Sequence, residues 1–157
     1  MDAEQETVWS LMAKLDYCML VTQTVDGMRS RPMSSIVEKD ERRIYFLTSA
    51  DTFKDDEIAA NPNILLTYSD GNATFVSTAA TAVLDSDREL VRELWNPGAQ
   101  AFWPEGPETE NIIAIVATPT EAHYWDGPNA VVRAIRFSMA LATGTTPNMG
   151  DEGTVDL

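Results

Sequence analysis

The sequence has few of the residues that build disulfides and metal sites. It contains one cysteine, Cys18, and one histidine, His123, in 157 residues. A single cysteine excludes an intramolecular disulfide, and one cysteine with one histidine falls short of the four ligands of a structural zinc site. Cys18 lies in the apolar run 17–21, so we expect a small buried side chain and not a nucleophile. We expect His123, which has no nucleophile beside it, on the surface of a strand.

Several motifs of common function classes are also absent. The sequence has no glycine-rich P-loop and no GxGxxG, which are the commonest phosphate-binding loops. It has no GxSxG element of a serine hydrolase and no apolar run of about 20 residues, the length needed to span a membrane. Residues 1–6 are acidic, whereas a secretory signal begins with a basic segment. We therefore expect a cytoplasmic protein.

Positive charge is scarce. Eleven Lys and Arg stand against 25 Asp and Glu, which gives a net charge of −14 and argues against nucleic acid or an anionic membrane as partner. The cations that do occur gather in one stretch, where six of them are found: Arg29, Arg31, Lys39, Arg42, Arg43 and Lys54. Lys39, Arg42 and Arg43 surround a charged turn and are expected to face solvent.

Hydrophobic periodicity and turn residues predict an antiparallel protein of one domain. Asp26-Gly27 predicts a hairpin turn, and Pro32 predicts an irregular or edge strand. Helices are predicted over 5–15, 54–60, 86–95 and 129–143, and strands over 16–24, 29–37, 43–49, 64–68, 73–84, 112–118 and 121–126. This order predicts a mainly β (α+β) fold, an antiparallel split β-barrel with accessory helices. The domain is expected to cover 1–143, with a closing helix at its end and a polar tail over 144–157.

One segment brings groups together that could bind a phosphate. A predicted strand ends at Thr48-Ser49, and a helix follows that carries Lys54 in its first turn. Hydroxyls, backbone N–H groups and an ammonium there suit a phosphate monoester. Serine and threonine before a helix are also ordinary capping residues, and the residues alone leave both interpretations open.

A set of motifs in a fixed order along the chain decides between these two interpretations. The motifs are Arg31-Pro32-Met33, Ile44-Tyr45-Phe46-Leu47-Thr48-Ser49, Lys54, Asn61-Pro62-Asn63-Ile64, Leu94-Trp95-Asn96-Pro97, Phe102-Trp103-Pro104-Glu105-Gly106 and Glu121-Ala122-His123-Tyr124-Trp125-Asp126. In these motifs the chain resembles the pyridoxamine 5′-phosphate oxidase-like superfamily, and within it the general stress protein branch.

The resemblance implies a split barrel that forms a homodimer, with FMN bound at the subunit interface. By position, Arg31, Pro32 and Met33 would border the flavin ring, and Phe46, Leu47 and Thr48 would line it. Ser49, Thr52 and Lys54 would hold the phosphate, and the Trp103 loop would close the site. One departure from the family pattern is Phe53, which stands where the oxidases often carry an arginine, so that one charged contact to the phosphate is missing and Arg29 or Arg31 could replace it. The resemblance assigns no catalytic side chain.

The resemblance leaves two functions open. One is an FMN-dependent oxidoreductase of unknown substrate, with a small-molecule or nicotinamide reductant; the basic substrate-phosphate site of the oxidases is missing, so pyridoxamine phosphate oxidation is not expected. The other is a flavin store or sensor without turnover. A split barrel for another ligand, such as a deazaflavin or haem, is a weaker alternative. Of the other aromatic residues, Trp95 is expected in the core and Trp125 between the barrel and its closing helix.

Overall fold

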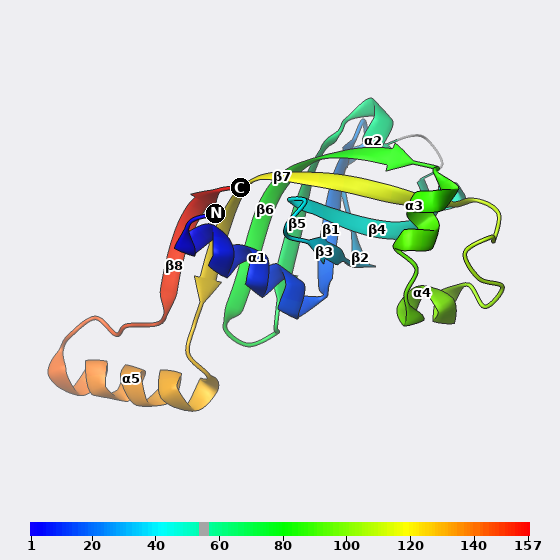
Figure 1. Ribbon diagram of the computed structural model, residues 1–157. Helices are drawn as coiled ribbons and strands as arrows, with labels where there is room; N and C mark the ends of the chain where they lie inside the picture. The colour runs from blue at the N-terminus through cyan, green and yellow to red at the C-terminus, as the bar shows by residue number, and fades with distance from the viewer. Residues whose placement is uncertain (54–56) are drawn as a thin grey trace.

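A computed structural model describes residues 1–53 and 57–157 of the chain. Every strand described belongs to one antiparallel sheet (Figure 1), as predicted. The strands are β1 (Tyr17–Thr24), β2 (Gly27–Ser34), β3 (Ile36–Glu38), β4 (Arg43–Ser49), β5 (Asn63–Ser69), β6 (Thr74–Asp85), β7 (Ile112–Asp126) and β8 (Asp151–Asp156). The helices are α1 (Ala3–Leu15), α2 (Glu57–Ala60), α3 (Arg88–Glu93), α4 (Pro97–Phe102) and α5 (Ala130–Thr143), with a 3₁₀ turn η1 (Ala50–Phe53).

The sheet is curled into a barrel that stays open on one side. Its order is β2-β1-β5-β6-β7-β4-β3, and β8 pairs with β7 outside this path. Strands β2 and β4, far apart in that order, nevertheless approach within 8 Å between Cα atoms. The barrel is therefore split between β2 and the β3–β4 pair, and a pocket lies at that split.

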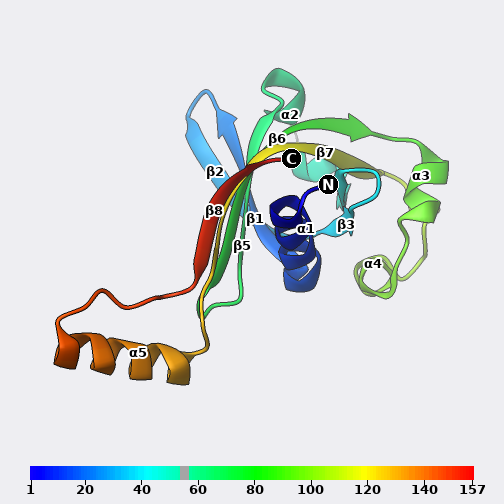
Figure 2. The ribbon, with the colours of Figure 1, turned by 60° about the vertical axis from the view of Figure 1, so that its left-hand side comes forward.

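Helix α1 fills the concave side of the sheet (Figure 2). Asp2 and Gln5 form a reciprocal capping box at its start, which satisfies two backbone N–H groups that a helix leaves unpaired. Trp9 and Met12, on its inner face, are fully buried. They pack in the main core with inward strand residues such as Leu20 and Phe46. Cys18 lies in the same cluster, so its predicted burial is confirmed.

Two separate strands were predicted over 112–118 and 121–126, but one strand, β7, runs through 15 residues. Pro119, which cannot donate a ladder hydrogen bond, lies within this strand. It is accommodated by the pairing with β6, whose register shifts between Ala79 and Ala80, opposite Glu121 and Pro119. An irregularity of this kind leaves room for a residue without an N–H.

The C-terminal expectation was wrong in two respects. Asp151–Asp156 do not form a tail: they make β8, paired along β7, because ladder bonds join backbone groups whatever the polarity of the side chains. Helix α5 does not close the barrel either. It projects away from the sheet in both ribbon views, and none of its residues is buried. Arg133 fixes it by donating to the carbonyl and side-chain oxygens of Asn72, at 2.8 and 2.9 Å.

Candidate functional site

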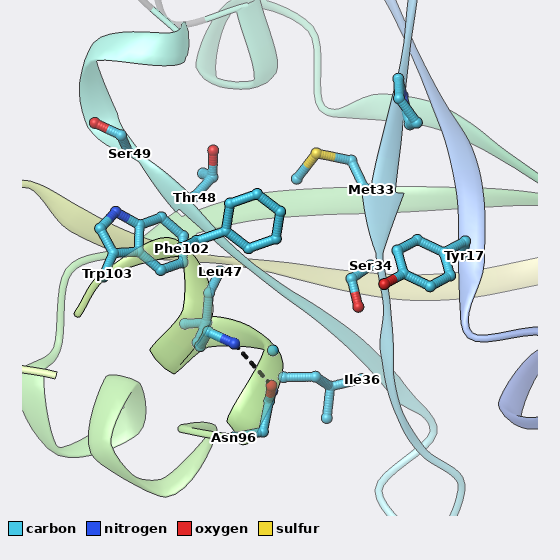
Figure 3. A pocket seen from close by; sticks show the side chains of 13 residues that line it. Tyr17, Met33, Ser34, Ile36, Leu47, Thr48, Ser49, Asn96, Phe102 and Trp103 are labelled. Atoms are coloured by element: carbon cyan, nitrogen blue, oxygen red, sulfur yellow. Dashed lines mark hydrogen bonds between the residues drawn. The ribbon is translucent and has the colours of Figure 1, made fainter. Parts of the chain in front are cut away.

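A pocket of the described residues lies at the split of the barrel (Figure 3). Its volume is about 260 Å³, and β1, β2, β4 and the short helix α4 contribute to its walls. In Figure 3 the Met33 side chain extends from β2 toward Thr48 and Phe102 on the other side. The lining residues are Tyr17, Pro32, Met33, Ser34, Ile36, Leu47, Thr48, Ser49, Asn96, Gly98, Ala99, Phe102 and Trp103.

Helix α4 is held over the end of β4 by local capping. Asn96 accepts a hydrogen bond from the backbone N–H of Ala99 at 3.0 Å, and Pro97 takes the first helical position, where its missing N–H costs nothing. Beneath this helix, Leu94 packs with Tyr45 and Ala114 in a second buried cluster. The loop after α4 is tied down by Arg88, which donates to the carbonyls of Pro107, Thr109 and Ile112.

The pocket combines aromatic and apolar walls with neutral polar groups. The Trp103 ring lies 6.2 Å from both the Trp95 and the Phe102 rings, and Phe102 is 77% exposed at the rim. Hydroxyls of Ser34, Thr48 and Ser49 supply donors and acceptors. Among the described lining residues none carries a charge. Flat apolar walls with a few directed polar groups are typical of sites for planar organic ligands.

Six of the ten predicted site residues meet in this pocket, namely Pro32, Met33, Leu47, Thr48, Ser49 and Trp103. Phe46 does not line it, because neighbouring side chains of a strand point to opposite faces. Phe46 is fully buried in the main core, beside the pocket residue Leu47. The Thr52 side chain and the whole of Lys54 lie outside the described residues. Arg31 is described but is absent from the lining.

Arg31 instead forms part of an ion-pair cluster around Glu57, which the sequence did not single out. Its Nη2 donates to Glu57 Oε2 at 2.9 Å, and Arg29 Nη1 donates to Oε1 at 3.5 Å. The buried Thr22 hydroxyl also donates to Oε2, at 2.8 Å. This hydrogen bond, followed by the charge of Arg31, lowers the pKa of Glu57 below its usual range. The carboxylate is thus ionised and held from three sides.

The sequence interpretation missed several lining residues: Tyr17, Ser34, Ile36, Asn96, Gly98, Ala99 and Phe102. Asn96-Pro97-Gly98 was interpreted as the end of a helix, although Asn before Pro equally fits the start of one. That signal was present and could have placed α4 over the site. Tyr17 and Ser34 are opposite each other in the β1–β2 pairing, which only the hairpin register reveals.

Other predicted residues have structural positions away from the pocket. His123 is exposed on β7, as expected; its Nδ1 lies 2.7 Å from Thr154 Oγ1 and its Nε2 lies 3.2 Å from Glu121 Oε1. Trp95 is half-buried and donates to Gln100 Oε1, so it is not a core residue. Trp125 does not contact a closing helix: it is 44% exposed and donates to the carbonyl of Met149. The described residues contain no cluster of potential metal ligands.

Comparison with known proteins decides the family. The family model described as pyridoxamine 5′-phosphate oxidase like matches residues 3–148. The chain belongs to this family. Among curated proteins, none matches the chain significantly.

Solved structures of similar fold agree with this membership. A candidate general stress protein 26 from Jannaschia sp. CCS1 matches with a TM-score of 0.80 and 25% identity over 100% of both chains. The general stress FMN/FAD binding protein from Xanthomonas citri matches with a TM-score of 0.67 and 25% identity over 77% of this chain and 87% of that one. A protein of Clostridium acetobutylicum related to general stress protein 26 and described with the pyridoxinephosphate oxidase family has a TM-score of 0.72. It is 15% identical over 100% of this chain and 97% of its own, and this likeness supports the fold.

Within the described residues no helix combines the length and the apolar character needed to cross a membrane.

Proposed function

We propose that the pocket at the barrel split holds FMN and that the chain is a flavin-dependent oxidoreductase of unknown substrate. The observation that carries the proposal is the convergence of six residues from three distant segments on one aromatic and hydroxyl-lined pocket. The family membership and the FMN/FAD binding described for the Xanthomonas citri neighbour support a flavin as the ligand.

The described residues fit the ring part of such a cofactor. Met33, Leu47 and Trp103 offer apolar surface on either side of the pocket, and stacking on a flat ring suits an aromatic side chain. Ser34 and Thr48 can donate to or accept from polar ring edges. When bound, FMN would supply electron and hydride exchange, and the protein would supply position and exclusion of water.

The phosphate end is less complete within the described chain. Ser49 supplies a hydroxyl at the end of β4, and Arg31 is the predicted site cation on β2. We propose that both reach the phosphate, together with Thr52 and Lys54. Charge-assisted hydrogen bonds from Arg or Lys are the strongest contacts available to a phosphate.

We also propose that the protein works as a homodimer. The convex faces of β1 and β5 carry Met19, Val21, Leu65 and Thr67, which adjoin one another in the strand register. In the β1–β2 pairing this uncharged surface continues into Tyr17, Pro32 and Ser34. Charged residues are depleted at the centre of protein interfaces, and two chains of net charge −14 repel each other least where carboxylates are absent.

This face and the pocket share a border, since Tyr17, Pro32 and Ser34 line the pocket. A second copy packed on the face would therefore add to the pocket. The single-chain volume of about 260 Å³ falls just below the roughly 300–1,000 Å³ typical of ligand sites, which agrees with a site that a partner completes. Helix α5 offers further apolar surface, with Val131, Phe137 and Leu141 more than half exposed.

A flavin store or sensor without turnover is the second candidate. It is favoured by the chemistry of the polar lining groups, which are hydroxyls and an amide. None of the described lining residues is a His, Asp, Glu, Lys or Cys, which are common general acids and bases. Pyridoxamine phosphate is not the substrate we propose, because a second phosphate would need its own cations. The cytoplasm remains the compartment we predict.

An absorption spectrum of the purified protein, followed by FMN titration with fluorescence quenching, tests the binding proposal. Ser49→Ala should weaken FMN binding by about 10–150-fold, the loss expected for one hydrogen bond to a charged group. The exposed Ser86→Ala, outside the pocket, should leave affinity unchanged. The proposal would be rejected if no binding is seen up to about 1 mM FMN, since a Kd of that size corresponds to a binding free energy of only about 4 kcal/mol. Addition of NAD(P)H to the flavin-bound protein distinguishes the two candidate functions. NAD(P)H should reduce the flavin of an oxidoreductase, whereas only a chemical reductant should reduce the flavin of a store or sensor.

A further inference from the structure

Glu57 is a carboxylate placed beside the cation that the flavin phosphate would use. Arg31 and Glu57 are both largely buried, with side chains 19% and 13% exposed, and they are joined at 2.9 Å. A phosphate and a carboxylate are both anions that bind a guanidinium through the same N–H groups. The ionised Glu57 therefore occupies donors of Arg31 that a phosphate would otherwise take.

The location of Arg31 ties this pair to the pocket. Arg31 pairs with Leu20 and Met33 pairs with Cys18 across the β1–β2 ladder, so both face the inner side of the sheet. Met33 lines the pocket, and Arg31 is two residues farther along the strand, about 7 Å away. The Cα atom of Arg31 is thus about one side-chain length from that of the pocket residue Met33.

Glu57 is fixed where it stands. The buried Thr22 hydroxyl donates to Oε2 at 2.8 Å, and Arg29 approaches Oε1 from the other side at 3.5 Å. If Arg31 turned toward a ligand, these two contacts would keep the carboxylate close to it. The ligand phosphate would then meet a fixed negative charge as well as a cation.

We propose that Glu57 determines the specificity of the site between phosphorylated and unphosphorylated flavins, by competing with the ligand phosphate for Arg31. Glu57 lowers the affinity for FMN and leaves the affinity for riboflavin, which has no phosphate, unchanged. This inference rests on the proposed flavin function.

The test is the affinity of wild type and Glu57→Gln for FMN and for riboflavin, measured by flavin fluorescence. Glu57→Gln should raise the affinity for FMN at least about tenfold, because one charged competitor for Arg31 is removed. It should change the affinity for riboflavin less than about twofold. Thr22→Val, which frees the carboxylate to move, should give a smaller gain for FMN. Glu108→Gln removes another carboxylate paired with an arginine, Arg92, outside the pocket, and should change neither ligand.

Each other outcome overturns the inference. A loss of FMN affinity in Glu57→Gln would mean that Glu57 positions Arg31 for the phosphate, and equal changes for both flavins would mean a general structural effect. If Glu57→Gln is too unstable to measure, the double variant Thr22→Val/Arg31→Gln carries the test. The gain in FMN affinity over riboflavin affinity that Thr22→Val gives alone must disappear in it. If wild type binds FMN and no variant changes the ratio of FMN affinity to riboflavin affinity, only this inference is rejected. If neither wild type nor any variant binds a flavin, the proposed function is rejected too.

Discussion

Trp103 lies against Trp95, with ring centroids 6.2 Å apart and planes inclined at 43°. The two rings come from either side of α4, and their tilted contact fixes the half-buried Trp103 at the pocket wall. Trp95 is held in turn by its hydrogen bond to Gln100 at 2.9 Å. An aromatic wall held in this way is already in place before a ligand arrives, which reduces the ordering cost of binding.

Trp103→Ala should therefore weaken FMN by about 5–30-fold, because an aromatic contact and its buried area are lost together. Trp103→Phe keeps a flat ring and should retain most of the affinity. Flavin fluorescence titration measures both. An alanine variant that binds as tightly as wild type would show that Trp103 lies outside the ligand's contact surface.

Site residues could be predicted from the sequence only where they are close together along the chain. Thr48-Ser49 at a strand end and Pro32-Met33 on an edge strand were found by motif and spacing. Phe46 was misplaced because a motif names consecutive residues, while a strand points them to alternate faces. Glu57 escaped notice because its partners Thr22, Arg29 and Arg31 lie 26 to 35 residues away, and only the packing of α2 against the barrel joins them.

The fold was predictable for a related reason. Antiparallel hairpins follow from local turn signals such as Asp26-Gly27, and most strands lay where alternation placed them. The C-terminal segment was not predictable, because β8 pairs with a strand about 30 residues earlier and its own residues are polar. Helix α5 has an apolar stripe, but a stripe does not say which surface covers it.

The uncharged sheet face predicts a dimer that one charge should disrupt. Met19→Glu places a carboxylate at the centre of this face and should weaken association by at least about tenfold, since an unpaired charge in an interface costs well over 1.4 kcal/mol. Sedimentation equilibrium measures the change. Ala13→Glu, on the exposed face of α1, adds the same charge elsewhere and should leave association intact. A wild-type monomer, or a dimer unaffected by Met19→Glu, would contradict this interface.

Acid should destabilise the protein partly through Asp70. Its Oδ1 accepts hydrogen bonds from the backbone N–H groups of Asn72, Ala73 and Thr74 at 2.8–3.0 Å, and these bonds, that of Thr74 foremost, lower the pKa of Asp70. Because the folded pKa is below the unfolded one, the stabilisation is complete above the unfolded pKa and is lost as pH falls toward the folded value.

Asp70→Asn keeps an acceptor but loses the charge, so stability at pH 7 should fall by about 0.5–1 kcal/mol, as for a weakened surface cap. The stability difference between pH 7 and pH 3 should shrink as well. Urea unfolding at both values measures the two effects. Asp26→Asn, at the exposed Asp-Gly turn, is the matched control and should change neither. An unchanged pH dependence in Asp70→Asn would show that the turn carboxylate contributes nothing to acid sensitivity.

Cys18 should be unreactive in the folded protein although it is the sole thiol of the chain. Burial raises its pKa to about 12, and the thiolate is the reactive form. At pH 8 the folded protein should therefore react with a thiol reagent far more slowly than the same protein in urea, where the pKa returns to about 8.5. Leu141→Cys, on exposed α5, adds one accessible thiol and should restore a fast phase of one equivalent. Fast labelling of folded wild type would show that the core around Cys18 opens readily.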